Sequence, residues 1–197
     1  MKTVIEWIIA NYVELVGAVL GIVYVLLAIR QNIWCWSVGI VSVAFYILIF
    51  YMVRLYGDMS LQIFYLIMGF YGWYAWFYAK GSADKLNISK IKRPILIIMF
   101  LAVVLMTPLF GYILTYTDDP IPYWDGFTTA LGLVGTWMTA RKYLENWLLW
   151  IFANIVCVGV YYYKELYPTV VFYAIMAVLA YRGYLIWGKE LKQIKHA

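Results

Sequence analysis

The sequence predicts an all-α integral membrane protein with seven transmembrane helices, arranged three-plus-one-plus-three as two parallel, pseudo-symmetric triple-helix units. The first observation is composition: 66% of the 197 residues are hydrophobic and the mean hydropathy is +0.81, more apolar surface than a soluble core buries. The second is seven apolar runs of about 20 residues, the length that crosses a hydrocarbon core. The third is a duplication, because residues 14–76 align without a gap on residues 125–187.

Eleven positions are identical in this alignment: Leu20, Gly21, Val23, Arg30, Trp36, Ile40, Tyr51, Leu55, Tyr56, Gly72 and Trp76. The predicted spans are approximately 11–29, 33–53, 60–79, 94–116, 125–140, 147–163 and 168–187. We therefore predict a single membrane domain over 1–197, with repeat 1 at about 11–79, a linker helix at about 94–116 and repeat 2 at about 125–187. The linker span has no repeat partner, and it restores the parallel orientation of the second copy.

The first span contains Gly17 and Gly21, four residues apart on one helix face. This spacing lets another helix approach closely. Gly21 has a counterpart in Gly132, which favours packing inside the bundle over a subunit interface. Pro94 and Pro168 open their spans, where the missing N–H does no harm.

The basic residues predict the orientation. Twelve cations fall on the side of the Lys80–Arg93 connection and the carboxyl terminus, while only Lys2, Arg54 and Lys164 fall on the other side, with Asp118 and Asp119. The positive-inside rule then places the amino terminus outside and the carboxyl terminus in the cytoplasm. The basic clusters determine topology, so a nucleic-acid partner is not predicted.

Cysteine and histidine usage argues against a metal site, a cofactor and catalysis. Cys35 and Cys157 lie in or beside spans and are interpreted as small packing residues. The only histidine, His196, is in a polar tail. An intramembrane enzyme needs a nucleophile with a base or a metal cluster, and a retinal protein needs a lysine within a helix core. The sequence supplies neither, so we predict no enzyme.

Aromatic residues make up 20% of the chain. Trp and Tyr gather at membrane interfaces, so those near span ends are interpreted as interfacial anchors: Trp7, Trp34, Trp76, Trp124 and Trp187. Four lie deeper, where a polar aromatic tip needs a partner or a cavity. These are Tyr65, Trp73, Trp150 and Tyr173.

Polar residues within spans are the sharper signal, because an unsatisfied amide in lipid costs several kcal/mol by the usual estimates. Gln62 and Asn154 are the two amides at such depth, accompanied by Ser42 and two threonines. Trp150 and Asn154 are four residues apart and share a helix face. Helix-to-helix hydrogen bonding is the competing interpretation. The predicted substrate-binding residues are Gln62, Trp150, Asn154, Tyr173, Tyr65, Trp73 and Ser42, around a site between the two repeats.

Glu14 and Asp125 are repeat counterparts in the first turns of their spans. A matched pair of acids suggests a cation site. An acid in the first turn also favours the positive end of the helix dipole and can cap free N–H groups, and we favour this capping interpretation.

Three strings resemble the PnuC family of bacterial vitamin transporters: Tyr71-Gly-Trp-Tyr-Ala-Trp76, Trp124-Asp125 and Arg141-Lys-Tyr-Leu-Glu-Asn-Trp-Leu-Leu-Trp150. The likeness covers residues 14–187. It implies a SWEET-like seven-helix fold, a central site, a homotrimer, and uptake by facilitated diffusion with trapping by an intracellular kinase. Ser42 and Phe172 depart from some nicotinamide riboside relatives, which carry an asparagine and an acid near these positions.

We therefore predict a vitamin permease that works by alternating access, with nicotinamide riboside as substrate and the lipid bilayer as its surroundings. Its flat, cationic pyridinium ring suits Trp and Tyr faces. Thiamine is also a flat cation, so it remains an alternative, as do other flat vitamins such as riboflavin. From another class, a passive channel or a structural membrane subunit remains open, and saturable uptake would separate it from a carrier.

Overall fold

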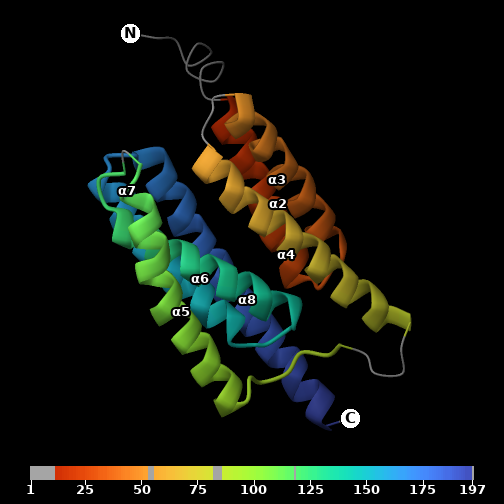
Figure 1. The fold of residues 1–197 in the computed structure, drawn as a ribbon. Helices are drawn as coiled ribbons and strands as arrows, with labels where there is room; N and C mark the ends of the chain where they lie inside the picture. The colour runs from red at the N-terminus through yellow and green to blue at the C-terminus, as the bar shows by residue number, and fades with distance from the viewer. Residues whose placement is uncertain (1–11, 53–55, 82–85, 118, 197) are drawn as a thin grey trace. The chain divides into compact units, whose positions relative to one another are not determined.

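The computed structural model describes residues 12–52, 56–81, 86–117 and 119–196, which form seven α-helices (Figure 1). They are α2 (Tyr12–Ile29), α3 (Trp34–Met52), α4 (Tyr56–Gly81), α5 (Arg93–Leu114), α6 (Pro122–Ala140), α7 (Asn146–Tyr163) and α8 (Tyr167–His196). Within these ranges no strand occurs apart from one isolated β-bridge. The prediction of an all-helical chain with seven spans is confirmed, and α8 continues about two turns beyond the predicted end.

The helices fall into two compact units, one up to Trp73 and one from Tyr74 onward. The first contains α2, α3 and most of α4. The second contains the last turns of α4 together with α5 to α8. The linker helix therefore belongs to the same unit as the second repeat.

In the first unit, glycines set the distances between helices. Gly17 faces the Tyr46 side chain of α3, and Gly69 leaves room for Ile40, to which an added Cβ would approach within 3.0 Å. The predicted close approach at Gly17 is confirmed as packing inside the unit. At Gly72, a Cβ would come within 2.4 Å of the Trp36 ring, so α4 can lie against this indole only where the side chain is absent.

In the second unit, α6 is the central helix. It packs between α5 and α7, and α7 in turn packs on α8. A Cβ on Gly126 would come within 2.5 Å of the Gly111 backbone nitrogen, so α5 and α6 touch almost backbone to backbone. All residues from Ala130 to Ala140 except Trp137 are buried. In contrast, α5 exposes Phe100 and Leu105, as expected for a helix that faces lipid.

The turn after α2 and the turn after α6 have the same geometry. Gln31 and Lys142, which are repeat counterparts, both have φ of 52°. The N–H of Lys142 donates to Thr139 and the N–H of Tyr143 donates to Met138, at 3.0 and 3.1 Å. The same two bonds recur in the turn after α2, at 2.9 Å each. This pattern is the Schellman motif, in which a left-handed residue ends the helix.

The segment that leads into α5 is tied to the α6–α7 turn. Ser89 exchanges backbone hydrogen bonds with Lys142 and Leu144 at 3.2 and 2.9 Å. The N–H of Ile91 donates to Glu145 Oε2 at 2.9 Å. Ile88 is buried beside this tie at 3% exposure. The start of α5 is therefore anchored to the α6–α7 turn of the second repeat, on the side of the bundle that carries most of the cations.

Three helices are long and apolar enough, within the described residues, to cross a membrane unaided, and they cover residues 93–114, 146–163 and 167–194.

The interpretation of Trp76 and Trp187 as interfacial anchors is wrong, because both are buried. The Trp76 indole donates to the Ala140 carbonyl at 3.1 Å. Trp34 and Trp124 are exposed as expected, whereas Trp7 lies outside the described residues.

Candidate functional site

One face of α7 carries a stripe of polar and aromatic side chains: Trp150, Asn154, Cys157 and Tyr161. Their spacing of four, three and four residues keeps them on one side of a helix with 3.6 residues per turn. Asn154 and Cys157 are buried, and the two aromatic residues are half-buried. We call this face the α7 stripe. It points into the second unit, toward α6 at one end and α8 at the other.

At the first end of the stripe, Trp150 lies against α6. Its indole N–H donates to Thr139 Oγ1 at 3.1 Å, and Gly135 leaves space for the ring, since an added Cβ would come within 3.0 Å of it. The polar tip of Trp150 thus has a protein partner. What the half-buried ring offers a ligand is its flat face.

Asn154, one turn further, is the polar centre of the stripe. It is only 5% exposed, and no side-chain hydrogen bond is found for it in the described part of the chain. A buried amide carries two donors and an acceptor that normally find partners. The part of Asn154 in substrate binding stays a prediction.

At the other end of the stripe, Tyr161 stacks on Tyr173 of α8. Their ring centroids are 5.1 Å apart and the planes differ by 13°. Cys157 also interacts with Tyr173 through its side chain. The predicted residue Tyr173 therefore joins the face that carries Trp150 and Asn154. Cys157 and Cys35 are both buried and neither forms a disulfide, which agrees with the interpretation of both as packing residues.

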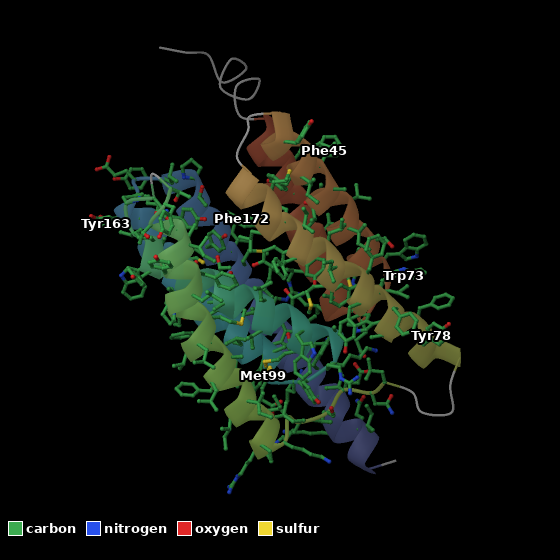
Figure 2. The ribbon with its side chains drawn as sticks, in the orientation of Figure 1. Phe45, Trp73, Tyr78, Met99, Tyr163 and Phe172 are labelled. Atoms are coloured by element: carbon green, nitrogen blue, oxygen red, sulfur yellow. The ribbon has the colours of Figure 1, made fainter. Side chains whose placement is uncertain are left out.

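The other predicted site residues belong to the first unit. Ser42, Gln62 and Tyr65 are half-buried, and Trp73 is 37% exposed. Figure 2 shows Trp73 at the surface of α4, on the same helix as the exposed Tyr78. The four residues come from two helices, α3 and α4. Their part in a common site with the α7 stripe stays a prediction.

Burial of polar side chains distinguishes the two repeats. The buried threonine, asparagine and charged residues of the described chain are Thr136, Thr139, Asn146 and Asn154. All four lie in the second repeat. Their counterparts in the first repeat are Val25, Ala28, Cys35 and Val43. Hydrogen-bonding capacity in the interior is therefore concentrated in α6 and α7.

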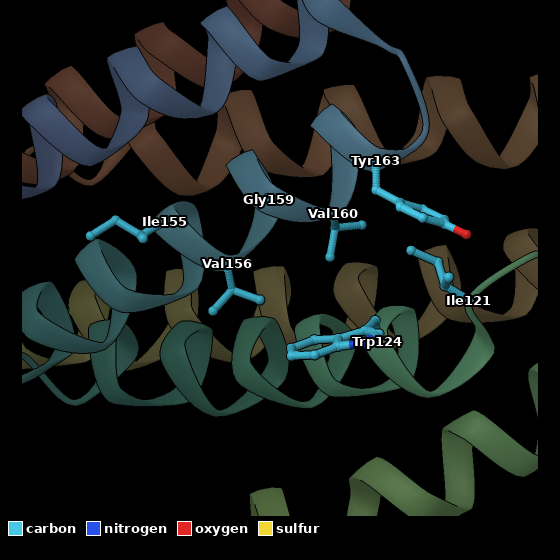
Figure 3. A pocket seen from close by; sticks show the side chains of 7 residues that line it. All are labelled: Ile121, Trp124, Ile155, Val156, Gly159, Val160 and Tyr163. Atoms are coloured by element: carbon cyan, nitrogen blue, oxygen red, sulfur yellow. The ribbon is translucent and has the colours of Figure 1, made fainter.

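A cavity of about 540 Å³ lies on the opposite side of α7 (Figure 3). It is lined by Ile121, Trp124, Ile155, Val156, Gly159, Val160 and Tyr163. Trp124, Ile155 and Tyr163 are more than half exposed, so this cavity opens on the apolar outer surface. Its lining is mostly apolar, with the Trp124 indole N–H and the Tyr163 hydroxyl as its side-chain hydrogen-bonding groups, and none of the predicted site residues lines it.

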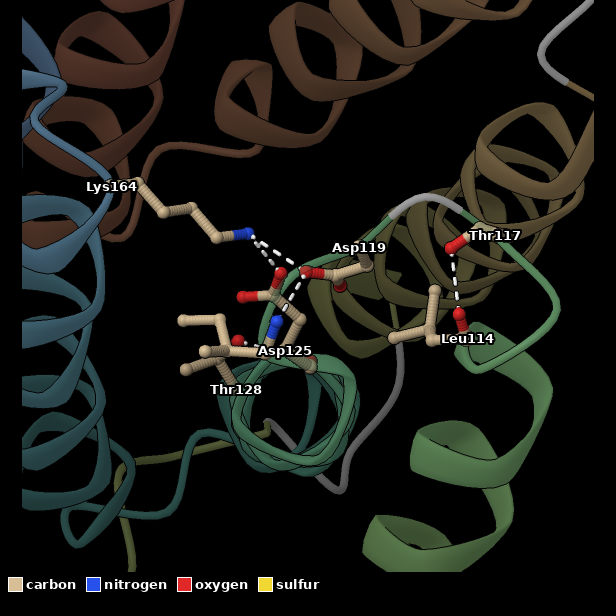
Figure 4. Close-up of polar contacts among 7 residues, drawn as sticks. Leu114, Thr117, Asp119, Asp125, Thr128 and Lys164 are labelled. Carbon is tan, nitrogen blue, oxygen red and sulfur yellow. Dashed lines mark hydrogen bonds and ion pairs between the residues drawn. The ribbon is translucent and has the colours of Figure 1, made fainter.

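A charged cluster ties the α5–α6 connection to the α7–α8 turn (Figure 4). Lys164 Nζ forms ion pairs with Asp125 and with Asp119 Oδ1, the latter at 3.3 Å. Asp119 also accepts the Ile121 N–H at 3.1 Å. Asp125 lies in the first turn of α6, as the dipole interpretation requires, but its carboxylate caps no N–H among the described residues. Its partner is Lys164, and Asp119 accepts the N–H at the start of α6. The Glu14 side chain lies outside the described residues.

These contacts shift the pKa values of Asp119, in the α5–α6 connection, and of Lys164, in the α7–α8 turn. Burial alone raises the pKa of Asp119, but bonds with Asp125 and the Ile121 N–H and the charge of Lys164 outweigh it and lower the pKa below its usual value. Burial alone lowers the pKa of Lys164, but the two carboxylates outweigh it and raise the pKa. The Lys164 ammonium therefore occupies the position between the two carboxylates that a metal cation would need.

The sequence predicts Trp150 and Asn154 as neighbours on one helix face, but it does not show what holds Trp150. Thr139 is one of the two threonines within spans, and its bond to an indole eleven residues later depends on how α6 and α7 cross. Tyr161 was also missed. Its position two turns after Asn154 was a usable signal, because i and i+7 share a helix face.

Comparison with known proteins gives a consistent match. A family model described as nicotinamide mononucleotide transporter matches residues 11–189. The nicotinamide riboside transporter PnuC of Escherichia coli (strain K12) is 26% identical over 93% of this chain and 87% of its own length. The riboflavin/roseoflavin transporter RibM of Streptomyces davaonensis is 25% identical over 73% of this chain and 68% of its own length.

A solved structure has the same fold. The crystal structure of the vitamin B3 transporter PnuC matches with a TM-score of 0.73, covering 93% of this chain and 83% of that chain, at 24% sequence identity. At this identity the likeness speaks for the fold alone.

Proposed function

Because the chain belongs to the nicotinamide mononucleotide transporter family, whose model matches residues 11–189, we propose that it is a permease for nicotinamide riboside. The observation that carries the proposal is the pair on the α7 stripe, a half-buried indole beside a buried amide to which the described residues supply no side-chain hydrogen bond. A flat cationic ring stacks on the first, and hydroxyl or carboxamide groups bond to the second. Each stacking contact of this kind contributes about 0.5 to 2 kcal/mol.

Charge supports the riboside over the mononucleotide of the family's name. A phosphate needs lysine or arginine within reach, and the stretches 34–52, 122–140 and 146–163 contain neither. Arg182 of α8 is exposed, and Lys164 is engaged by two aspartates. The Escherichia coli relative is also named for nicotinamide riboside.

Riboflavin is the second candidate, because a RibM protein named for riboflavin and roseoflavin is among the relatives. Its isoalloxazine ring is flat and could use the same indole face. Thiamine is the remaining flat cation. Direct comparison of the three vitamins on purified protein decides between them.

In this proposal Trp150 and Asn154 bind the ring and its polar groups, and Tyr173 extends the aromatic surface through its stack with Tyr161. In the first repeat, Gln62, Ser42, Tyr65 and Trp73 stay candidate substrate-binding residues. The permease works by alternating access, without ion coupling, and an intracellular kinase traps the vitamin. Its amino terminus is outside the inner membrane and its carboxyl terminus is cytoplasmic, as twelve cations against three favour.

Transport in proteoliposomes tests the proposal. Uptake of labelled nicotinamide riboside should saturate, should be unaffected by a proton or sodium gradient, and should stop at the external concentration. Enclosing a nicotinamide riboside kinase with ATP should then drive accumulation. A non-saturable flux would indicate a channel instead, and accumulation above the external concentration in empty vesicles under an ion gradient would refute facilitated diffusion.

A further inference from the structure

We propose that Thr139 is a positioning residue that fixes the plane of the Trp150 indole for stacking on the ring of the substrate. The inference rests on the proposed function, in which Trp150 supplies the stacking face. Thr139 is 1% exposed, so it acts through Trp150 and not by touching the ligand. It extends the site inward from the α7 stripe to the core of α6.

The geometry makes the Thr139 hydroxyl a relay. It accepts the Trp150 indole N–H at 3.1 Å and donates to the Gly135 carbonyl at 2.8 Å. Asn146 Oδ1 lies 3.2 Å away as an alternative acceptor. A hydroxyl has one proton and two acceptor lone pairs, so it can receive the indole proton only while its own proton is placed elsewhere. Gly135 and Asn146 provide that place.

Gly135 completes the arrangement from the other side. Since it has no side chain, the Trp150 ring lies directly against α6, within 3.0 Å of where a Cβ would be. The indole is thus held at its N–H by Thr139, and its Cε2 and Cζ2 atoms lie against Gly135. A ring fixed at two points needs no reordering when a flat ligand arrives, which favours binding.

Loss of the acceptor has a specific consequence. The Trp150 N–H would be left in apolar surroundings, at a penalty of about 1 to 3 kcal/mol. The indole relieves this penalty by turning toward another acceptor, and the turn changes the plane that it offers to the substrate. The substitution therefore weakens ligand binding more than a simple loss of packing does.

The chain provides two controls. Thr136, one turn earlier on α6, donates to the Gly132 carbonyl at 2.8 Å but contacts no indole through its hydroxyl. The first repeat places Ala28 at the position of Thr139 and Gly39 at the position of Trp150. There the aromatic ring comes from the opposite helix, as Tyr24 lies 3.3 Å from a Cβ on Gly39. The relay is therefore confined to the second repeat.

A double-mutant cycle on the purified full-length protein tests the inference by calorimetric titration with nicotinamide riboside. Thr139→Val should weaken binding about 5- to 100-fold, while Thr139→Ser and Thr136→Val stay within about 2-fold of wild type. In a Trp150→Phe background, which has no N–H, Thr139→Val should add less than about 2-fold. Thr139→Cys, of similar size and a weak acceptor, replaces Thr139→Val if the valine variant does not fold, and should also weaken binding.

Three results would overturn the inference. These are an unchanged affinity in Thr139→Val, an equal loss in Thr136→Val, and a full loss from Thr139→Val in the Trp150→Phe background. Wild-type protein that binds riboflavin or thiamine in place of nicotinamide riboside refutes the proposed substrate alone, and the same cycle with that vitamin then decides the role of Thr139. Wild type that binds none of the three overturns both.

Discussion

The two repeats share one scaffold and differ in their chemistry. Trp36 faces Gly72 in the first repeat, and Trp147 faces Gly183 in the second, with added Cβ atoms at 2.4 and 2.6 Å from the rings. These two pairs are counterparts in the alignment of the repeats. The left-handed turns after α2 and α6 also repeat. What the duplication preserves is the contact of a tryptophan on the second helix with a glycine on the third.

The interior polar groups do not repeat. Wherever the second repeat buries a threonine or an asparagine, the first has valine, alanine or cysteine. The aromatic ring between the first two helices of each repeat also comes from a different helix. In the first repeat Tyr24 of α2 faces Gly39, and in the second Trp150 of α7 faces Gly135. Buried polar groups are expensive unless they have partners, and Thr136, Thr139 and Asn146 have theirs inside the second repeat. The comparison teaches that the repeats share their helix packing and that the buried hydrogen-bonding groups are specific to the second repeat.

The largest expected effect comes from making the second repeat resemble the first at its polar centre. Asn154→Val introduces the residue of the counterpart Val43. It removes a buried hydrogen-bonding group and should weaken nicotinamide riboside binding by about 5- to 150-fold. Gln62→Ala in the first repeat should weaken it less. Both are measured by titration calorimetry alongside thermal stability.

If Asn154→Val binds normally but loses thermal stability, the amide is a structural tie between helices. An effect of Gln62→Ala larger than that of Asn154→Val would place recognition in the first repeat and break the proposed asymmetry.

The next effect tests the shared scaffold. Gly72→Ala and Gly183→Ala each place a Cβ far inside contact distance of a tryptophan ring. Overpacking of this kind costs about 1 to 3 kcal/mol, and both variants should lose thermal stability to a similar extent in detergent. Gly159→Ala is the control, because no atom lies within 4 Å of an added Cβ there. A loss confined to one repeat would contradict the common scaffold.

A smaller effect is expected at the charged cluster of the second repeat. Lys164→Gln leaves Asp119 and Asp125 without their cation and should destabilise the protein by about 1 kcal/mol at neutral pH. In wild type, the lowered pKa of Asp119 makes its contribution complete above its usual 3.8, and the raised pKa of Lys164 makes its contribution complete below 10.5. Asp119 and Lys164 themselves should therefore add no pH dependence to the stability between about pH 5 and about pH 9.

Thermal unfolding across this pH range checks the expectation. A steep dependence in wild type near neutral pH would show that another group controls the stability of this end of the molecule.

The smallest effect concerns the turn after α7, where Glu165 has φ of 59°. Glycine adopts this conformation without a steric penalty. Glu165→Gly should therefore raise stability by up to about 1 kcal/mol, measured as a small increase in melting temperature. A decrease would mean that the Glu165 side chain makes a stabilising contact.

The spans and the duplication were predictable because both are local or periodic properties of the sequence. The apolar runs predict seven helices in the observed order, although α4 is longer than expected and α8 extends beyond its predicted end. That Trp150 and Asn154 are neighbours was also predictable, because residues four apart share a helix face. These inferences need no knowledge of which helices touch.

The remainder depended on helix packing, which the sequence does not show directly. Trp76 and Trp187 lie near span ends, yet they are buried by neighbouring turns. Asp125 pairs with Lys164, and because the two are 39 residues apart the sequence alone does not show this contact. The anchor of Trp150 at Thr139 likewise arises where two helices cross.

The most direct test of recognition by the second repeat is an experimental structure of the protein with nicotinamide riboside bound. We predict that the pyridinium ring lies on the face of Trp150 and that the side-chain amide of Asn154 bonds to its carboxamide or ribose. A ligand held wholly by first-repeat residues, or one in the outer cavity against Trp124 and Ile155, would contradict the account.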